Sequence, residues 1–143
     1  MHFVTVMILV SACLAGVNCR WDGKCNKNKK VLKLVMEKQA ILVCPEQLGG
    51  LPTPRRPAEC KGKKVFDIDG NDLTVCFRRG AKEALGIAKM YGCRKAILKS
   101  NSPSCGCGKI YDGSFKKVLV CGDGVFSRML KENKIKVITE KEI

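Results

Sequence analysis

The sequence predicts one α/β domain with a mainly parallel, Rossmann-like sheet and helices on the faces of that sheet. Short apolar runs alternate with amphipathic, lysine-rich segments, which is the order of strands and helices in such folds. The length of 143 residues suits one hydrophobic core, and the chain has neither a tandem repeat nor a long linker. We therefore assign residues 7–143 to a single domain and residues 1–6 to an N-terminal extension.

The strands of the main sheet are predicted from short apolar runs that end in polar or turn-forming residues. These runs are residues 7–10, 40–43, 95–98, 118–121 and 135–138. Residues 64–68 predict a further short strand. Residues 109–115 contain an Asp-Gly pair and predict a small hairpin.

Apolar residues at helical spacing predict three helices, over residues 26–39, 73–91 and 123–133. Asn26 or Asn28 can cap the first of them. Asp123 either caps the last one or belongs to a helix start whose free amides bind an anion. The proline-stiffened segment LPTPRRP (51–57) cannot be helical and predicts an extended loop that presents Arg55 and Arg56.

The composition restricts the setting and the partners. Ten cysteines occur without any C-x-x-C spacing, which argues against zinc ribbons and ferredoxin-type sites. Because they lie in or beside apolar segments, we expect a reducing cytoplasm in which most thiols pack as small hydrophobic groups. The net charge of +14 favours anionic partners such as phosphorylated substrates or RNA, although solvated lysines account for most of it.

Three of the expected strands each deliver a cysteine at the carboxyl end: Cys13, Cys44 and Cys105. In an open parallel sheet these ends share the edge where ligands bind. Three converging thiolates suit an iron–sulfur cluster with one open iron, or a zinc ion with an open position. The alternative is three buried thiols without a ligand, and the spacing alone leaves that alternative open.

Polar side chains near these cysteines are candidates for catalysis. Glu46 follows Cys44 by two residues, and Ser102 and Ser104 precede Cys105. A carboxylate beside a Lewis-acidic metal can activate water, and a serine hydroxyl can relay a proton. Cys107 forms a C-x-C with Cys105 and is a candidate spare ligand or resolving thiol, and Cys121 at the end of another apolar run is a further candidate.

The apolar N-terminal segment allows a second interpretation. Val10-Ser11-Ala12-Cys13 resembles a bacterial lipobox, whose cysteine would carry a lipid. The segment lacks the basic residues of a signal peptide and is too short to span a bilayer. We therefore expect a buried first strand and no membrane partner.

Five motifs together resemble the small bacterial and archaeal family that contains the thiouracil desulfidases. They are SACLAGVNCRWDG (11–23), CPEQLGGLPTPRRPAE (44–59), AILKSNSPSCG (96–106), IYDGSF (110–115) and GDGVFSRMLKENKIKV (122–137). The resemblance runs in order along nearly the whole chain. The N-terminal extension, Trp21 and Cys107 depart from the family pattern without removing a key position.

The resemblance implies a [4Fe-4S] cluster held by Cys13, Cys44 and Cys105, with one iron open to the substrate sulfur. It implies Glu46 and Ser102 as the acid/base residues. The implied reaction is a non-redox hydrolysis in which water replaces sulfur on a thiopyrimidine, giving the oxo pyrimidine and hydrogen sulfide. The substrate is then a thiolated base, nucleoside or nucleotide, and RNA is a weaker candidate. The alternative function is a cytoplasmic sulfur carrier that uses cysteine thiols, acting with RNA thiolation.

Overall fold

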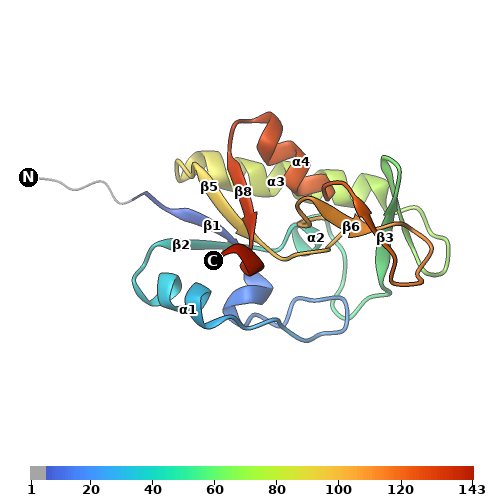
Figure 1. Cartoon of the computed structure of the whole chain (residues 1–143), viewed down its shortest axis with the longest axis horizontal. Helices are drawn as coiled ribbons and strands as arrows, with labels where there is room; N and C mark the ends of the chain where they lie inside the picture. Colours follow the sequence, from blue (N-terminus) through green and yellow to red (C-terminus); the bar gives the residue numbers. More distant parts are fainter. Residues whose placement is uncertain (1–5) are drawn as a thin grey trace, which may run out of the picture.

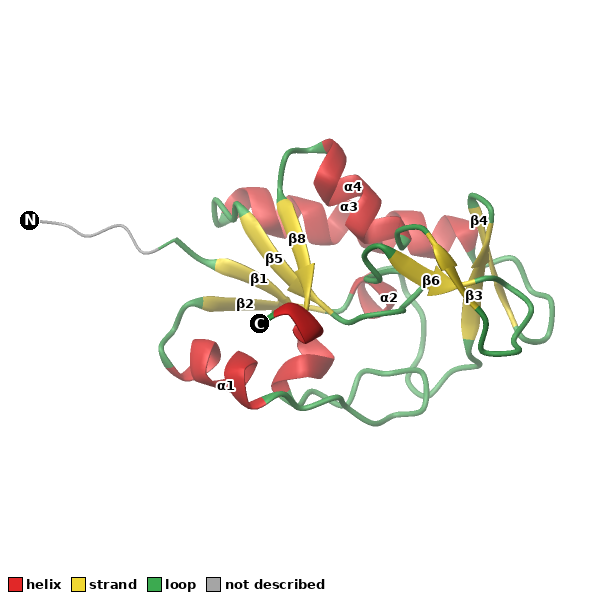
Figure 2. Ribbon diagram, viewed as in Figure 1, coloured by secondary structure: helices red, strands yellow, loops and turns green. Residues whose placement is uncertain are grey.

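The computed structural model describes residues 6–143, which form a parallel four-stranded sheet with helices on both faces (Figures 1 and 2). The first five residues of the expected N-terminal extension lie outside the described residues. The strand order is β2-β1-β5-β8. The strands are β1 (Ile8–Ser11), β2 (Ala40–Val43), β5 (Lys95–Leu98) and β8 (Lys136–Thr139). The predicted α/β class and four of the five predicted main-sheet strands are confirmed.

Helices cover the two faces because successive residues of each strand point to opposite sides. Leu9, Ala96 and Val137 pack with the helices α3 (Thr74–Met90) and α4 (Val125–Glu132). Val10 and Ile97 pack on the other face, with the helix α1 (Lys29–Met36) and the short 3₁₀ helix η1 (Ala12–Ala15). Each central strand is therefore buried on both sides, which explains its continuous apolar sequence.

The strand order reverses at β1, which pairs with β2 on one side and β5 on the other. The connection from β1 to β2 runs through α1, and the connection from β2 to β5 runs through α3 on the opposite face. In open α/β sheets, such a reversal opens a crevice beyond the carboxyl ends of the strands. The segments that follow β1, β2 and β5 meet at this crevice.

A smaller lobe of two antiparallel hairpins lies beside the sheet and corrects two predictions. One hairpin joins β3 (Ala58–Lys61) to β4 (Lys64–Asp67), of which only β4 was predicted from the sequence. The other joins β6 (Lys109–Tyr111) to β7 (Leu119–Cys121). Residues 118–121 were therefore wrongly assigned to the parallel sheet, and the hairpin predicted over 109–115 is present but extends to Cys121. The connection between these strands is too short for a parallel crossover, and all three residues of β7 are exposed.

The N-termini of α1 and α4 test two predicted helix caps. Asn28 caps α1, accepting from the amides of Lys30 and Val31 as predicted. Asp123 does not cap α4, since Gly124 is the N-cap and Asp123 instead accepts from the amide of Gly108 and pairs with Lys131. None of the helices within residues 6–143 is long and apolar enough to cross a membrane.

The short helix α2 (Pro45–Leu48) packs closely on α3 through glycine, so a larger residue there will destabilise the protein. A Cβ added at Gly80 of α3 would collide with the carbonyl oxygen of Pro45. We expect Gly80→Ala to lower the free energy of unfolding by about 1–3 kcal/mol or more, because the two backbones must move apart. Denaturant unfolding of the purified variant measures this change.

Gly86 provides the control on the same helix, because an added Cβ there meets nothing within 4 Å. Gly86→Ala should raise the free energy of unfolding by about 0.5–1 kcal/mol, the helix-propensity difference between the two residues. Equal effects of the two substitutions would contradict the close packing of α2 on α3.

Candidate active site

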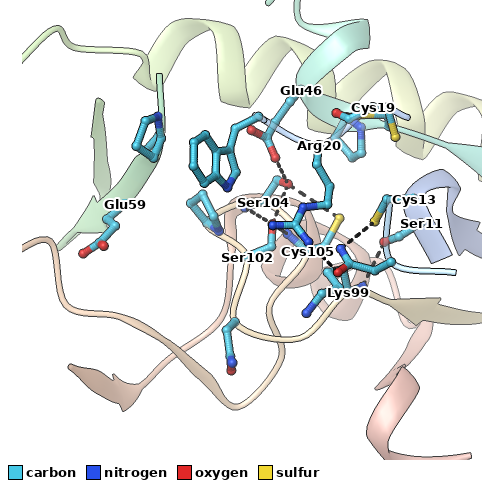
Figure 3. Close-up of a pocket in the computed structure, with 18 of the residues that line it drawn as sticks. Ser11, Cys13, Cys19, Arg20, Glu46, Glu59, Lys99, Ser102, Ser104 and Cys105 are labelled. Carbon is cyan, nitrogen blue, oxygen red and sulfur yellow. Dashed lines mark hydrogen bonds between the residues drawn. The ribbon is translucent and has the colours of Figure 1, made fainter. Parts of the chain in front are cut away.

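The three strand-end cysteines line one cavity at the carboxyl edge of the sheet. Figure 3 labels two of them, Cys13 and Cys105. Cys13 lies in η1 directly after β1, Cys44 is the N-cap of α2 directly after β2, and Cys105 lies in the loop after β5. The cavity has a volume of about 520 Å³. Since β2, β1 and β5 are neighbours in the sheet, parallel pairing brings together three thiols that are distant in sequence.

Cys19 is a fourth thiol in this cavity, although it follows no strand. Its side chain is buried and packs with Cys13 and Cys44. The thiol of Cys44 also points to the carbonyl oxygen of Cys19, at 3.8 Å. The loop after η1 returns to the sheet edge and places Cys19 there, and the only sequence signal for this was the short spacing to Cys13.

Hydrogen bonding and burial change the thiol pKa values in opposite directions. A hydrogen bond with the Cys19 thiol lowers the pKa of Cys13. A second hydrogen bond with the Cys19 thiol lowers the pKa of Cys44 to about 7. The pKa of Cys19 itself is raised, and the largest cause is its hydrogen bond with Cys13. Burial raises the pKa of Cys105 to about 12. A metal that binds Cys105 as thiolate must therefore displace a proton.

A chain of polar contacts leads to the sulfur of Cys13. Asp22 pairs with Arg20 at 3.1 Å, and Arg20 donates to the amide oxygen of Asn26 at 2.7 Å. Because that oxygen is occupied, the amide nitrogen of Asn26 faces Cys13 Sγ, at 3.8 Å. Donors to a ligand sulfur stabilise its anionic form.

The loop that carries Cys105 rests on the N-terminus of α4. The carbonyl oxygens of Pro103 and Ser104 accept from the first amides of that helix, and Ser127 Oγ donates to the carbonyl of Cys105 at 2.7 Å. These amides are therefore occupied, and the predicted alternative of an anion site at this helix start is wrong. A Cβ at Gly106 would lie 2.6 Å from the carbonyl oxygen of Ser102, so the loop has this conformation only with glycine there.

Glu46 meets the serine loop inside the cavity (Figure 3). Ser104 Oγ donates to Glu46 Oε2 at 3.1 Å, and Ser102 Oγ lies 3.1 Å from Ser104 Oγ. Ser102 therefore reaches Glu46 through Ser104. Ser104 is almost fully buried, whereas Ser102 is partly exposed at the cavity surface. The three side chains form a relay in which only one serine touches the carboxylate.

In the extended loop of residues 51–57, Arg55 points into the cavity. Its side chain is 7% exposed and pairs with Glu46 at 3.1 Å. The side chain of Arg56 is 62% exposed and pairs with Asp69 at the surface. The extended conformation alternates the directions of the two side chains, so one points into the cavity and the other away from it.

The rest of the cavity lining is partly aromatic and partly basic. Trp21, Tyr111 and Phe115 contribute aromatic side chains. Lys99 and Lys117 contribute positive charge, and Lys99 lies 3.6 Å from Glu140. Such a lining suits a flat, polar ring of small size.

Two other candidate cysteines lie apart from this site. The thiol of Cys107 points to the carbonyl oxygen of Val137, and Cys107 is not among the described residues that line the cavity. Cys121 is exposed at the end of β7. Within residues 6–143, no three Cys, His, Asp or Glu side chains form a group that could hold a single metal ion. No disulfide joins any of the ten cysteines, all of which are described.

Comparisons with known proteins agree with the fold and the motifs. The family described as "2-thiouracil desulfurase" matches residues 8–142. The uncharacterized protein YbbK of Bacillus subtilis (strain 168) is 43% identical, over 96% of this chain and 97% of that protein. The solved structure of a [4Fe-4S]-dependent thiouracil desulfidase, TudS, superposes with a TM-score of 0.92 at 43% identity, over 96% of this chain and 93% of that chain. The chain therefore belongs to the 2-thiouracil desulfurase family, as the five sequence motifs predicted.

Proposed function

We propose that the protein is a [4Fe-4S]-dependent desulfidase that replaces the sulfur of a thiouracil-type pyrimidine with oxygen from water. The observation that carries the proposal is a single cavity that joins three strand-end thiols to a carboxylate–serine relay. The family and the TudS neighbour support the cofactor and the substrate class.

The donor set supports Cys13, Cys44 and Cys105 as the cluster ligands. Thiolates are the ligands that iron–sulfur clusters use, and three of them leave one iron of a [4Fe-4S] cluster open. A single zinc ion would need three or more ligand side chains to meet around one point, and within residues 6–143 no such group of Cys, His, Asp or Glu is formed. When bound, the cluster supplies a Lewis-acidic iron for the thiocarbonyl sulfur, which makes the adjacent ring carbon more electrophilic.

The protein side chains supply the water and move its protons. Glu46 Oε2 accepts a proton from the water that attacks the ring carbon, and Ser104 and Ser102 orient that water through their hydroxyl groups. The C–O bond forms, the C–S bond breaks, and the electron pair leaves with sulfur. Protons returned from the relay complete hydrogen sulfide and the oxo pyrimidine. The reaction consumes water and needs no electron donor.

We infer that the substrate is a small thiolated pyrimidine, as a base, nucleoside or nucleotide. The aromatic lining suits the flat ring, and the volume of about 520 Å³ matches a small ligand. Lys99 and Lys117 favour a substrate with a phosphate group. Binding of a thionucleotide that weakens with salt, beside salt-independent binding of the free base, supports this preference, and equal affinities contradict it.

The first experiment is anaerobic purification followed by iron, sulfide and activity measurements. We expect about four iron and four acid-labile sulfide per chain, with the charge-transfer absorption of a cluster. Incubation with 2- and 4-thiouracil should then release hydrogen sulfide and uracil in equal amounts. Oxygen-18 from labelled water should appear in the uracil, and its absence would contradict hydrolysis.

A protein that stays free of iron after reconstitution would contradict the cluster proposal. An additional sulfur atom on Cys105 or Cys107, detected by mass spectrometry, would then favour the alternative of a sulfur carrier that works with RNA thiolation. The packing of Cys107 away from the cavity does not support a transfer between these two thiols.

The free thiols fit a reducing compartment, and we infer that the protein acts in the cytoplasm.

A further inference from the structure

Arg55 makes more polar contacts inside the cavity than its place in an extended loop predicts. Its Nε and Nη2 lie 3.2 and 3.1 Å from Glu46 Oε1. Nη2 also donates to the carbonyl of Cys19 at 3.0 Å, and Nη1 donates to Thr53 Oγ1 at 3.1 Å and to the carbonyl of Pro52 at 3.3 Å. The backbone amide of Arg55 donates to the carbonyl of Trp21 at 2.7 Å. One buried guanidinium thus joins the carboxylate to two loops of the cavity.

These contacts make the two oxygens of Glu46 inequivalent. Oε1 accepts from Arg55 Nε and forms the ion pair with Nη2, whereas Oε2 accepts from the hydroxyl of Ser104. The side chain of Glu46 is 16% exposed, so little water is present to replace a lost partner. A carboxylate with one oxygen anchored in this way cannot exchange its oxygens by rotation without breaking the charge-assisted hydrogen bond from Nε and the ion-pair contact with Nη2.

We propose that Arg55 is the positioning residue of the site: it anchors Glu46 Oε1 so that Oε2 stays directed at Ser104 and the attacking water. The inference rests on the proposed function, since it concerns the base of that reaction. Arg55 touches neither substrate nor reacting atoms in this scheme and acts only through Glu46. Lysine cannot replace it fully, because the ammonium group lacks the planar fork that engages Glu46, Thr53 and the Cys19 carbonyl together.

The kinetic test uses Arg55→Lys and Arg55→Ala, with Arg56→Ala as the matched control. We expect both Arg55 variants to keep their iron and sulfide and to lose roughly 10- to 100-fold in kcat, because a displaced base costs rate more than binding. KM should change by less than about threefold. Guanidinium ion at millimolar concentration should restore part of kcat in Arg55→Ala only. Arg56 contacts Asp69 at the surface, so Arg56→Ala should match the wild type with and without guanidinium.

A double-mutant cycle separates positioning from general support of the fold. If Arg55 acts through Glu46, then adding Arg55→Ala to Glu46→Gln should cost no further activity. Independent, multiplying losses would overturn the proposal, and so would a full kcat per iron in Arg55→Ala. These results require an active wild type, so they differ from failure of the proposed function, in which the wild type itself releases no sulfide.

A chemical measurement tests the same contact without any turnover. Labelling of Glu46 by a water-soluble carbodiimide, located by mass spectrometry, should be slow in the wild type because Arg55 and Ser104 occupy both oxygens. It should be faster in both Arg55 variants and unchanged in Arg56→Ala. Equal labelling of Glu46 in all four proteins would overturn the proposal even if the enzyme assay failed.

Discussion

Glu46→Gln should keep its cluster and lose roughly 100- to 10,000-fold in desulfuration rate, the usual contribution of a general base. Glutamine fits the same space: its amide oxygen can still accept from Arg55, and its amide nitrogen can donate to Ser104 Oγ, so the cavity should keep its shape. An amide cannot accept a proton from water at neutral pH. Hydrogen sulfide release per iron, measured beside the iron content and the absorption spectrum, tests this expectation. Glu46→Ala should be as inactive as Glu46→Gln and should also keep the visible absorption of the cluster.

Glu83→Gln is the control for the loss of one negative charge. Glu83 is exposed on α3 and does not line the cavity, so its variant should have the wild-type rate. A Glu46→Gln variant as active as this control would show that another group is the base. Ser104→Ala and Ser102→Ala then test the order of the relay. We expect the larger loss of rate in Ser104→Ala, because Ser104 touches Glu46 directly and Ser102 reaches it only through Ser104.

Cys105→Ala should abolish both iron binding and activity while the protein remains folded. Cys105 is buried, but the substitution removes only one sulfur atom from a loop that Ser127 and the first turn of α4 hold. Iron and sulfide analysis after anaerobic reconstitution measures the cluster, and far-ultraviolet circular dichroism measures the fold. We expect the same loss of iron in Cys13→Ala and Cys44→Ala, because each would supply one of only three ligands.

The neighbouring thiols make the ligand assignment specific. Cys121 is exposed and remote from the cavity, so Cys121→Ala should keep its full iron content. Cys19→Ala is the stricter comparison, since Cys19 lies among the proposed ligands. We expect the Cys19→Ala variant to keep its iron. The thiol of Cys19 is a hydrogen-bond partner of Cys13 and Cys44, and Cys19, unlike the proposed ligands, does not follow a strand. Loss of iron in Cys19→Ala together with its retention in Cys105→Ala would overturn the proposed ligand set.

Local sequence pattern was sufficient for most of the main sheet. The run 96–98 is buried and apolar throughout because both faces of the sheet are covered there, and such a run can be recognised without knowledge of its neighbours. The residues of β7 have the same apolar character for another reason, since they form an exposed hairpin strand. Composition cannot distinguish these cases, because pairing partners belong to distant parts of the chain.

The strand-end cysteines were predictable for a topological reason. Parallel strands end at a common edge, so Cys13, Cys44 and Cys105 could be expected to meet once the sheet was predicted. The position of Cys19 could not be expected in this way, because a loop returns it to the edge. Loop paths depend on contacts such as the hydrogen bond from Arg55 to the carbonyl of Cys19, which no local pattern records.

The sequence by itself determined the fold class, the family and the residue types gathered at the sheet edge. Periodicity, turn residues and five long motifs carry that information, and each of them is local. Only the tertiary structure decided that Arg55 is buried against Glu46 while Arg56 is exposed, and that Ser104 stands between Ser102 and the carboxylate. The physical reason is that a side chain's partner depends on which distant segment packs beside it, and folding brings those segments together from across the chain.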